Sequence, residues 1–388
     1  MSKHSDIERA ERVIEPYMDD LKTIVNIDSG TYTKAGIDRV GSYLQERFSA
    51  LGFSTHVDKQ EDYGNHLIAT HQGKAQKGPR ILLIGHIDTV FSEGEVERRP
   101  FSISQQNGKR IATGPGVLDM KSGVLIGMYG LHLLIDARED TYSSVTFLCN
   151  SDEEIGSPSS RSIVQELARQ SDAVLVFEPG RAEGTIVSSR KGCGQYRVEV
   201  HGLSAHAGVE PQKGRNAILE LSYQVQKMQA LNGTIPGVSV SVGIIRGGER
   251  TNVVPDYAYF DMDVRTSDQA GLQALEAAMR KVTTQNMLQG TRITLSGSML
   301  VGPFERSRYN AQLIELAKDA GRELGLKIQD VGSGGASDAN TSAAMGIPTL
   351  DGLGAGGGLA HNPGEYIELD YLPARIALVA GLVRRIRR

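Results

Sequence analysis

The sequence predicts an α/β fold in which a mostly parallel sheet is flanked by helices, with a smaller α+β domain of ferredoxin-like topology inserted into it. Two observations predict this architecture. Short, fully apolar runs alternate with helical segments at both ends of the chain, as in a parallel sheet covered by helices. From about residue 191 to 303, strand-like segments instead alternate between apolar and polar residues, which indicates a sheet with one solvated face.

Length and composition are those of an ordinary soluble protein. The 388 residues allow two or three domains of about 150 residues each, and 39% apolar with 23% charged residues is a globular balance. We expect no membrane partner, because no apolar run looks long enough to cross a bilayer and the polar N-terminus carries no secretory signal. A net charge of −4 gives no reason to expect nucleic acid. Cys149 and Cys193 are too few for a disulfide framework, which fits a reducing cytoplasm.

The first part of the chain alternates helices with buried strands. Apolar residues three and four positions apart predict amphipathic helices over 6–25 and from Ile37 to Leu51, the second capped by Gly52. The apolar run 81–85 predicts a buried strand that ends at His86. Further strands are expected at 53–58, 66–71, 144–150 and 173–177, and further helices at 122–136 and 159–170.

The segment 191–303 is expected to form a separate, inserted domain. Its elements follow the order strand, helix, strand, strand, helix, strand of the ferredoxin-like split unit. They are expected at 195–200, 214–231, 238–245, 257–265, 268–287 and 292–297. Residues 1–190 and 304–388 would then form one discontinuous domain.

The last part of the chain returns to the first pattern, with helices expected at 307–324 and 371–387, a short helix opened by the glycine-rich turn 332–338, and a strand at 347–350. The loop that follows this strand, 352–357, fits the G-x-G-x-x-G signature of dinucleotide sites, but a lone match is weak. Pro363 lies where the helix of that signature would run, and too little chain remains for the rest of the fold. We therefore reject a dinucleotide site.

Histidines and carboxylates gather at the ends of the predicted strands. They are His86 with Asp88, Asp119, Glu153 with Glu154, Glu178, and His361. In open α/β sheets, sites form outside the carboxyl ends of the strands. Carboxylates that converge there cannot all stay ionised without a cation, so we expect one or two divalent metals. Imidazole and carboxylate ligands suit zinc, with cobalt or manganese possible.

Each of these residues alone also has an ordinary structural explanation. A carboxylate after a strand often caps the following helix. A His-x-Asp at a strand end is more often a satisfied histidine than a ligand, and a Glu-Glu pair is often a solvated turn. The joint pattern favours metal binding, because five strand ends carry side chains of the ligand type.

Five segments resemble the metal-site motifs of the co-catalytic zinc carboxypeptidase/aminoacylase family, which includes acetylornithine deacetylase and succinyl-diaminopimelate desuccinylase. The similarity extends from about residue 15 to the C-terminus and is greatest to bacterial glutamate carboxypeptidase. The segments are Ile84-Gly-His-Ile-Asp-Thr-Val, Gly114-Pro-Gly-Val-Leu-Asp-Met-Lys-Ser-Gly, Ser151-Asp-Glu-Glu-Ile-Gly-Ser, Phe177-Glu-Pro-Gly and Ala360-His-Asn-Pro-Gly-Glu.

The resemblance implies two zinc ions per subunit, with cobalt or manganese as possible substitutes. His86 and Glu178 would hold one ion, Glu154 and His361 the other, and Asp119 would bridge both.

The same resemblance assigns two residues that bind no metal. Asp88 would orient His86, and Glu153 would be the general base that takes a proton from a water bridging the ions. A cis peptide is also implied between Asp119 and Met120.

The inserted domain resembles the family's lid and dimerisation domain. Gly202-Leu-Ser-Ala-His206-Ala-Gly matches the motif whose histidine enters the partner subunit's site and polarises the scissile carbonyl, which implies a homodimer through 191–303. Asn252 and Arg265 match segments that bind the substrate's free carboxylate, for which a guanidinium fork is suited. The alternative for Arg265 is an exposed arginine paired with Asp263. Four further histidines are assigned no role beyond structure or surface: His66, His71, His132 and His201.

The resemblance implies metal-dependent hydrolysis of an amide or peptide bond in a small peptide or N-acyl amino acid with a free carboxylate. A carboxypeptidase that releases C-terminal glutamate is the expected activity. Glu178 favours it, since in the family glutamate at that position goes with carboxypeptidases and deacylases, and aspartate goes with aminopeptidases. An N-acyl-amino-acid deacylase, similar to aminoacylase or acetylornithine deacetylase, or a dipeptidase remains the alternative on the same site. A catalytically silent metal-binding or scaffold protein would be expected to lack the base or a ligand, and all are present.

Overall fold

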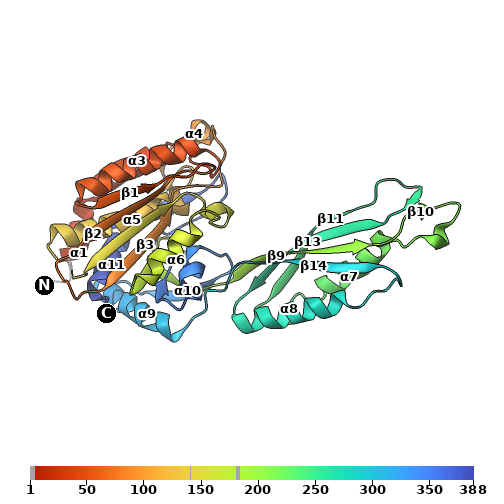
Figure 1. The fold of residues 1–388 in the computed structure, drawn as a ribbon. Coiled ribbons are helices and arrows are strands. Elements are labelled where there is room, and N and C mark those ends of the chain that lie inside the picture. The colour runs from red at the N-terminus through yellow and green to blue at the C-terminus, as the bar shows by residue number, and fades with distance from the viewer. Residues whose placement is uncertain (1–4, 140, 181–183) are drawn as a thin grey trace. The chain divides into compact units, whose positions relative to one another are not determined.

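The computed structural model describes residues 5–139, 141–180 and 184–388, and the chain divides into two compact units (Figure 1). Unit 1 comprises Met1–Ser188, Arg306–Gly332 and Ser337–Arg388, and unit 2 comprises Ser189–Glu305 and Ser333–Ala336. The predicted first domain includes 1–190 and all of 304–388, whereas residues 189–190, 304–305 and Ser333–Ala336 group with unit 2. The short segment Ser333–Ala336 groups with unit 2 because the Lys191 N–H donates to the Ser333 carbonyl at 3.0 Å and the Arg190 guanidinium donates to the Gly335 carbonyl at 3.2 Å.

Unit 1 is built on a six-stranded sheet, which confirms the predicted α/β class. Strands β6, β3, β7 and β16 are parallel neighbours, while β1 and β2 are antiparallel additions at one edge. In sheet order the strands are β1 (Ser54–Asp58), β2 (His66–Gln72), β6 (Ser144–Asn150), β3 (Arg80–His86), β7 (Ala173–Val176) and β16 (Thr349–Leu350).

Helices surround this sheet close to their predicted positions. They are α1 (Ser5–Arg12), α2 (Ile14–Val25), α3 (Lys34–Ala50), α5 (Ser122–Asp136), α6 (Arg161–Arg169), α9 (Arg308–Glu323), α10 (Asp338–Ala344) and α11 (Leu372–Arg385). The single helix expected over 6–25 is instead interrupted at Val13. Pro16 explains the interruption, because it has no N–H to donate to the Arg12 carbonyl and its ring crowds that carbonyl.

One helix corrects the expectation about bilayer-spanning segments. The helical segment Val117–Asp136 is long and apolar enough to cross a membrane by length and composition, but 83% of its most apolar 18-residue stretch is buried within the protein. It packs tightly on the sheet: a Cβ on Gly123 would lie only 2.0 Å from the Phe177 carbonyl oxygen. Such burial is what a core helix shows, and it brings the start of α5 next to the end of β7.

Several short strands were not predicted. The hairpin β4 (Ser102–Gln106) and β5 (Lys109–Thr113) joins β18 (Tyr366–Glu368) and β17 (Gly357–Gly358) in a second sheet. Its turn is Asn107-Gly108, with both residues at positive φ, which is the strongest short hairpin signal in a sequence. The short helix α4 (Glu95–Arg98) and the pair β8 (Thr185–Arg190) and β15 (Gln329–Ser333) were also missed.

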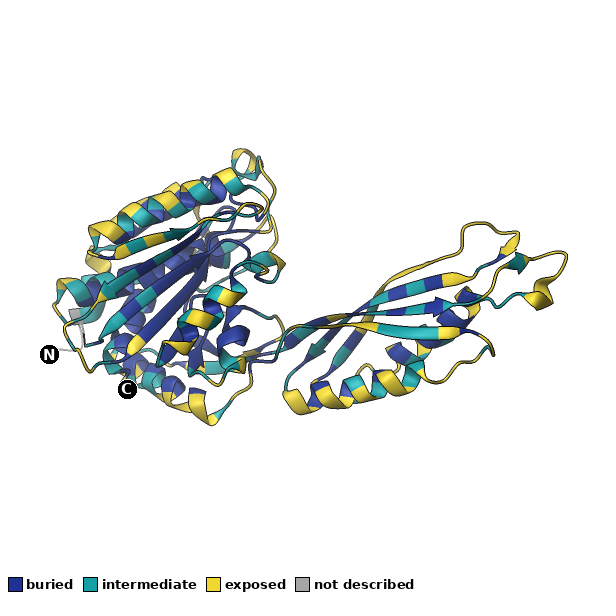
Figure 2. Ribbon diagram, in the orientation of Figure 1, coloured by how far each residue is buried: buried dark blue, intermediate teal, exposed yellow. Residues whose placement is uncertain are grey.

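Unit 2 has the predicted ferredoxin-like topology. Its antiparallel sheet has the order β11-β13-β9-β14, and the alternation of buried and more exposed residues along β9 and β13 is visible in Figure 2. The elements are β9 (Gly192–His201), α7 (Ala217–Gln229), β11 (Ser239–Gly247), β13 (Tyr257–Thr266), α8 (Gln269–Thr283) and β14 (Arg292–Val301). A separate two-stranded ribbon pairs β10 (Ala205–His206) with β12 (Val253–Val254).

Candidate metal centre

The predicted site residues of unit 1 meet at one edge of its sheet. His86 is the last residue of β3, Glu153 and Glu154 follow β6, and Glu178 follows β7. Because these three strands are parallel neighbours, their carboxyl ends deliver the side chains to the same place. Asp119 reaches it from the turn after β5. The peptide between Asp119 and Met120 is cis, as the resemblance implied.

Asp119 lies between the two histidines. Its Oδ1 is 3.0 Å from Nε2 of His86, and its Oδ2 is 3.1 Å from Nε2 of His361. A glutamate then lies beside each histidine: Glu178 Oε1 is 3.8 Å from His86 Nε2, and Glu154 Oε2 is 3.2 Å from His361 Nε2. The structure thus contains two histidine–glutamate pairs that share one aspartate.

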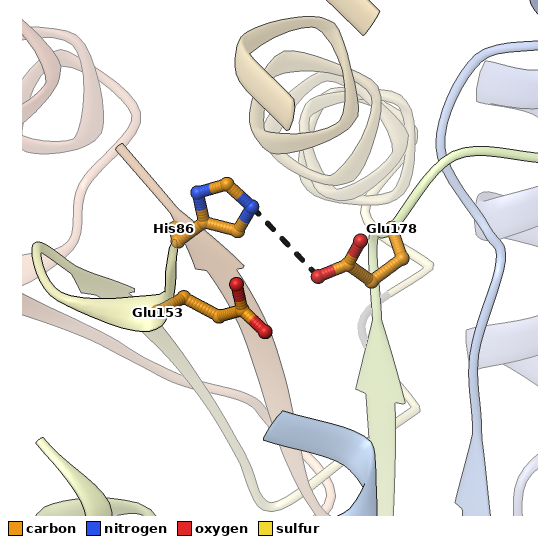
Figure 3. A group of neighbouring side chains, drawn as sticks. All are labelled: His86, Glu153 and Glu178. Carbon is orange, nitrogen blue, oxygen red and sulfur yellow. Dashed lines mark ion pairs between the residues drawn. The ribbon is translucent and has the colours of Figure 1, made fainter. Parts of the chain in front are cut away.

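Glu153 lies in the same cluster. The ligand-type atoms of His86, Glu153 and Glu178 are all within 4.8 Å of one another, and a second such group joins His86, Asp119 and Glu154. Figure 3 shows both carboxylates of the first group directed toward the space beside the His86 ring. Proximity alone would therefore also allow Glu153 to be a ligand.

Asp88 connects the end of β3 to the turn after β6. It is fully buried, and its carboxylate accepts the backbone N–H groups of Glu153 and Glu154, each at 3.3 Å, and the Thr31 hydroxyl at 2.7 Å. The carbonyl of Asp88 accepts from Nδ1 of His86 at 3.0 Å. In the neutral His86 ring the lone pair is therefore on Nε2, the nitrogen that faces Asp119.

The buried carboxylates in this cluster repel one another, and this repulsion changes their pKa values. Burial raises the pKa of Glu153, and the neighbouring Glu178 carboxylate raises it further. Burial also raises the pKa of Glu154, although His361 donates to it. Hydrogen bonds to Asp119 and Glu154 raise the pKa of His361 to about 10. Protons therefore balance the carboxylates when no cation is bound, and a divalent cation could replace those protons.

One buried oxygen indicates that the residues fit a cation. Among the described residues, Oε1 of Glu154 is buried and has no hydrogen-bond partner, while Oε2 faces His361. A buried carboxylate oxygen without a donor is costly, whereas a metal ligand needs a free lone pair. Together with two imidazoles, the carboxylates form a donor set that suits zinc, cobalt or manganese.

Sequence reasoning missed Glu365, which lies four residues after His361. This glutamate is completely buried, and burial raises its pKa to about 7. Its carboxylate accepts three backbone N–H groups of the turn that carries Asp119, those of Gly116, Leu118 and Asp119. The signal for Glu365 was its place in the same motif as His361, His361-Asn-Pro-Gly-Glu365. Its role could not be read from that place, because hydrogen bonds to distant backbone groups leave no pattern in a sequence.

The three candidate residues of unit 2 lie at its two ends. The carbonyl of Asn252 accepts the N–H of Ala207 at 3.0 Å, so Asn252 lies beside His206 at the β10–β12 ribbon, and both side chains are exposed. Arg265 is at the opposite end of β13, where its guanidinium donates to both oxygens of Asp263 at 2.9 and 3.0 Å. The ion pair with Asp263, the alternative given for Arg265, is therefore present. A role of Arg265 in substrate binding stays a prediction.

Comparison with known proteins places this site in context. The model of the family "Peptidase family M20/M25/M40" matches residues 82–385. Carboxypeptidase G2 of Pseudomonas sp. (strain RS-16) is 30% identical over 376 residues, which cover 94% of this chain and 87% of that protein.

Solved structures share the fold over nearly the whole chain. Aminopeptidase PepT from Bacillus cereus has a TM-score of 0.79 at 22% identity, covering 96% of this chain and 98% of its own. The YXEP protein of Bacillus subtilis, a dinuclear metal-binding peptidase, has a TM-score of 0.71 at 16% identity and the same coverage.

Proposed function

The chain belongs to peptidase family M20/M25/M40, a family of metallopeptidases, and we propose that it is a two-metal hydrolase that releases the C-terminal amino acid from a small peptide or N-acyl amino acid. The observation that carries this proposal is the position of Asp119, whose two oxygens face the two histidines, each of which has its own glutamate. Zinc is the metal we propose for both positions.

In this proposal, His86 and Glu178 would hold one ion, His361 and Glu154 would hold the other, and Asp119 would serve both. Bound divalent ions polarise the scissile carbonyl and make water a nucleophile near neutral pH.

Glu153 is the proposed proton carrier. Its carboxylate lies within the cluster, and its raised pKa favours acceptance of a proton during attack, followed by donation to the leaving amine. Asp88 holds the backbone of Glu153 and the ring of His86 in place.

A cavity beside the cluster supports an uncharged acyl group. This cavity of about 370 Å³ is lined by Glu154 and by the exposed apolar side chains of Tyr32, Val90 and Ile155. Its charged lining residues, Glu93 and Glu154, are both acidic. We propose that the apolar part of this lining receives the acyl side of the substrate. Arg265 and Asn252 stay the candidates for its free carboxylate, and because they lie at opposite ends of unit 2 they would have to come from different subunits.

Similarity to carboxypeptidase G2 favours carboxypeptidase over deacylase or dipeptidase activity. Hydrolysis of a matched panel tests this preference: N-benzoyl-glutamate, N-acetyl-glutamate, N-acetyl-ornithine and a dipeptide, with metal content measured on the same sample. We expect the highest kcat/KM for N-benzoyl-glutamate, by at least about tenfold over N-acetyl-ornithine, since the loss of one well-placed contact costs about that much. A preference for N-acetyl-ornithine would favour the deacylase instead.

We also propose a homodimer through unit 2. Strand β11 is an edge strand of the unit 2 sheet, and it exposes the neighbouring apolar residues Ile244 and Ile245. An exposed apolar edge is a ready site for strand pairing with a second copy. Gly192, close to where the chain enters unit 2, pairs with one end of β13, whereas His206 and Asn252 lie near the other end. This distance from the point of entry supports their action on the partner's site.

Mixed dimers test whether His206 acts in trans. His206→Ala and Glu153→Gln proteins are each expected to be nearly inactive, while a heterodimer of the two contains one complete site. Random mixing of subunits should therefore restore about a quarter of wild-type activity, because half the dimers are mixed and each has one intact site. Activity measured after subunit exchange checks this, and no recovery in verified heterodimers would contradict a role in trans.

A further inference from the structure

We propose that Glu365 is a positioning residue that fixes Asp119 and His361 relative to each other. The inference rests on the two-metal site proposed above and adds a residue that binds no metal itself. Glu365 ends the loop that carries His361 and directly precedes β18. Although it is a carboxylate, its side chain is completely buried, so its place must be explained by the groups it contacts.

Those groups are backbone N–H donors of the turn that carries Asp119. Oε1 of Glu365 accepts the N–H of Leu118 at 2.7 Å and that of Asp119 at 2.9 Å, and Oε2 accepts the N–H of Gly116 at 3.1 Å. Asp119 and Met120 in this turn have non-helical φ and ψ, and buried backbone N–H groups need an acceptor. Glu365 therefore supplies acceptors to this turn from a distant part of the chain.

These hydrogen bonds join the segment that carries Asp119 to the loop that carries His361. Strands β18 and β5 are antiparallel neighbours, with Tyr366 opposite Thr113, so the turn after β5 and the loop before β18 leave the sheet side by side. Across this junction, Asp119 Oδ2 lies 3.1 Å from His361 Nε2. Because Glu365 binds the backbone of Asp119 itself, the position of the bridging carboxylate relative to His361 depends on it.

A glutamine at this position cannot make the same contacts. Both carboxylate oxygens accept, whereas an amide has one oxygen and one donating nitrogen. Whichever way the amide is turned, its nitrogen faces at least one of the three N–H groups, and that group loses its acceptor. The turn that carries Asp119 is then free to shift, although the size of the side chain is almost unchanged.

The test compares Glu365→Gln with Glu368→Gln. Glu368 is three residues further along, and its carboxylate forms an ion pair with Lys109 at the surface, 2.9 Å away. Zinc is titrated into each metal-depleted full-length protein against a competing chelator, and the cobalt-loaded proteins are examined for magnetic coupling between the two ions. A shared carboxylate is expected to produce such coupling.

For Glu365→Gln we expect about 10- to 100-fold weaker binding of at least one ion, the usual effect of removing an outer partner of a ligand, and loss of the coupling. Glu368→Gln should match the wild type. Wild-type affinity and coupling in Glu365→Gln would overturn the proposal. If the wild type itself binds fewer than two ions, the proposed function fails instead.

Should Glu365→Gln not fold, Glu365→Asp takes its place. Aspartate keeps the charge but is shorter by one methylene, so it cannot reach all three N–H groups without a shift of the turn. We expect a folded protein with weakened coupling, and wild-type affinity for both ions together with unchanged coupling would overturn the proposal.

Discussion

Replacement of Glu153 with glutamine is expected to abolish turnover and leave the bound metal in place. The amide fills the same space but cannot accept a proton, and loss of a general base typically costs about 10²- to 10⁴-fold in rate. Metal should remain because the two histidine–glutamate pairs and Asp119 do not include this side chain. Steady-state hydrolysis of N-benzoyl-glutamate and elemental analysis of the same preparation measure both quantities.

The matched control for this variant is Glu166→Gln, an exposed glutamate on α6 in the same unit. It should keep both the rate and the metal content of the wild type. If Glu153→Gln retained wild-type turnover, Glu153 would not be the base. If it lost metal as well as activity, Glu153 would be a ligand, as its distances from His86 and Glu178 also allow.

Replacement of Asp119 with alanine is expected to remove both ions rather than one. Asp119 is the residue placed between the two histidines, so its loss deprives both positions of a ligand. We expect metal affinity to fall by more than about 100-fold, the upper end of the effect of losing an outer partner. Equilibrium dialysis against zinc, followed by elemental analysis, measures the number of ions retained.

Asp136→Ala is the control for Asp119→Ala, because Asp136 is exposed at the end of the helix that begins just after Asp119. It should bind two ions. Retention of one tightly bound ion by Asp119→Ala would show that this aspartate serves a single position and that the proposed bridge is wrong.

Much of the fold could be predicted because burial leaves a pattern in the sequence. The apolar run before His86 is a central strand with neighbours on both sides, and the alternation along 257–265 is the half-covered strand β13. The hairpin of β4 was missed because this strand has no buried face to reveal it. Strand β4 is exposed along its whole length, and the only mark of its hairpin is the Asn107-Gly108 turn.

The candidate site was predictable for a similar reason. Three of its residues lie at the ends of neighbouring parallel strands: His86, Glu154 and Glu178. The carboxyl ends of such strands meet at one edge of the sheet whatever the details of packing. The contacts of Glu365 could not be predicted in this way, because its partners are backbone groups that any residue would offer. Arg265 could not be assigned either, since the same side chain suits a substrate carboxylate and the adjacent Asp263.

The most direct test of the two-metal account is a metal titration that follows activity in a single preparation. The protein is depleted with a chelator, and zinc is then returned while hydrolysis of N-benzoyl-glutamate is measured. We expect activity to fall to background on depletion and to return with zinc, reaching its maximum at two ions per chain. Full activity in the metal-free protein, or a maximum reached at one ion per chain, would contradict the account.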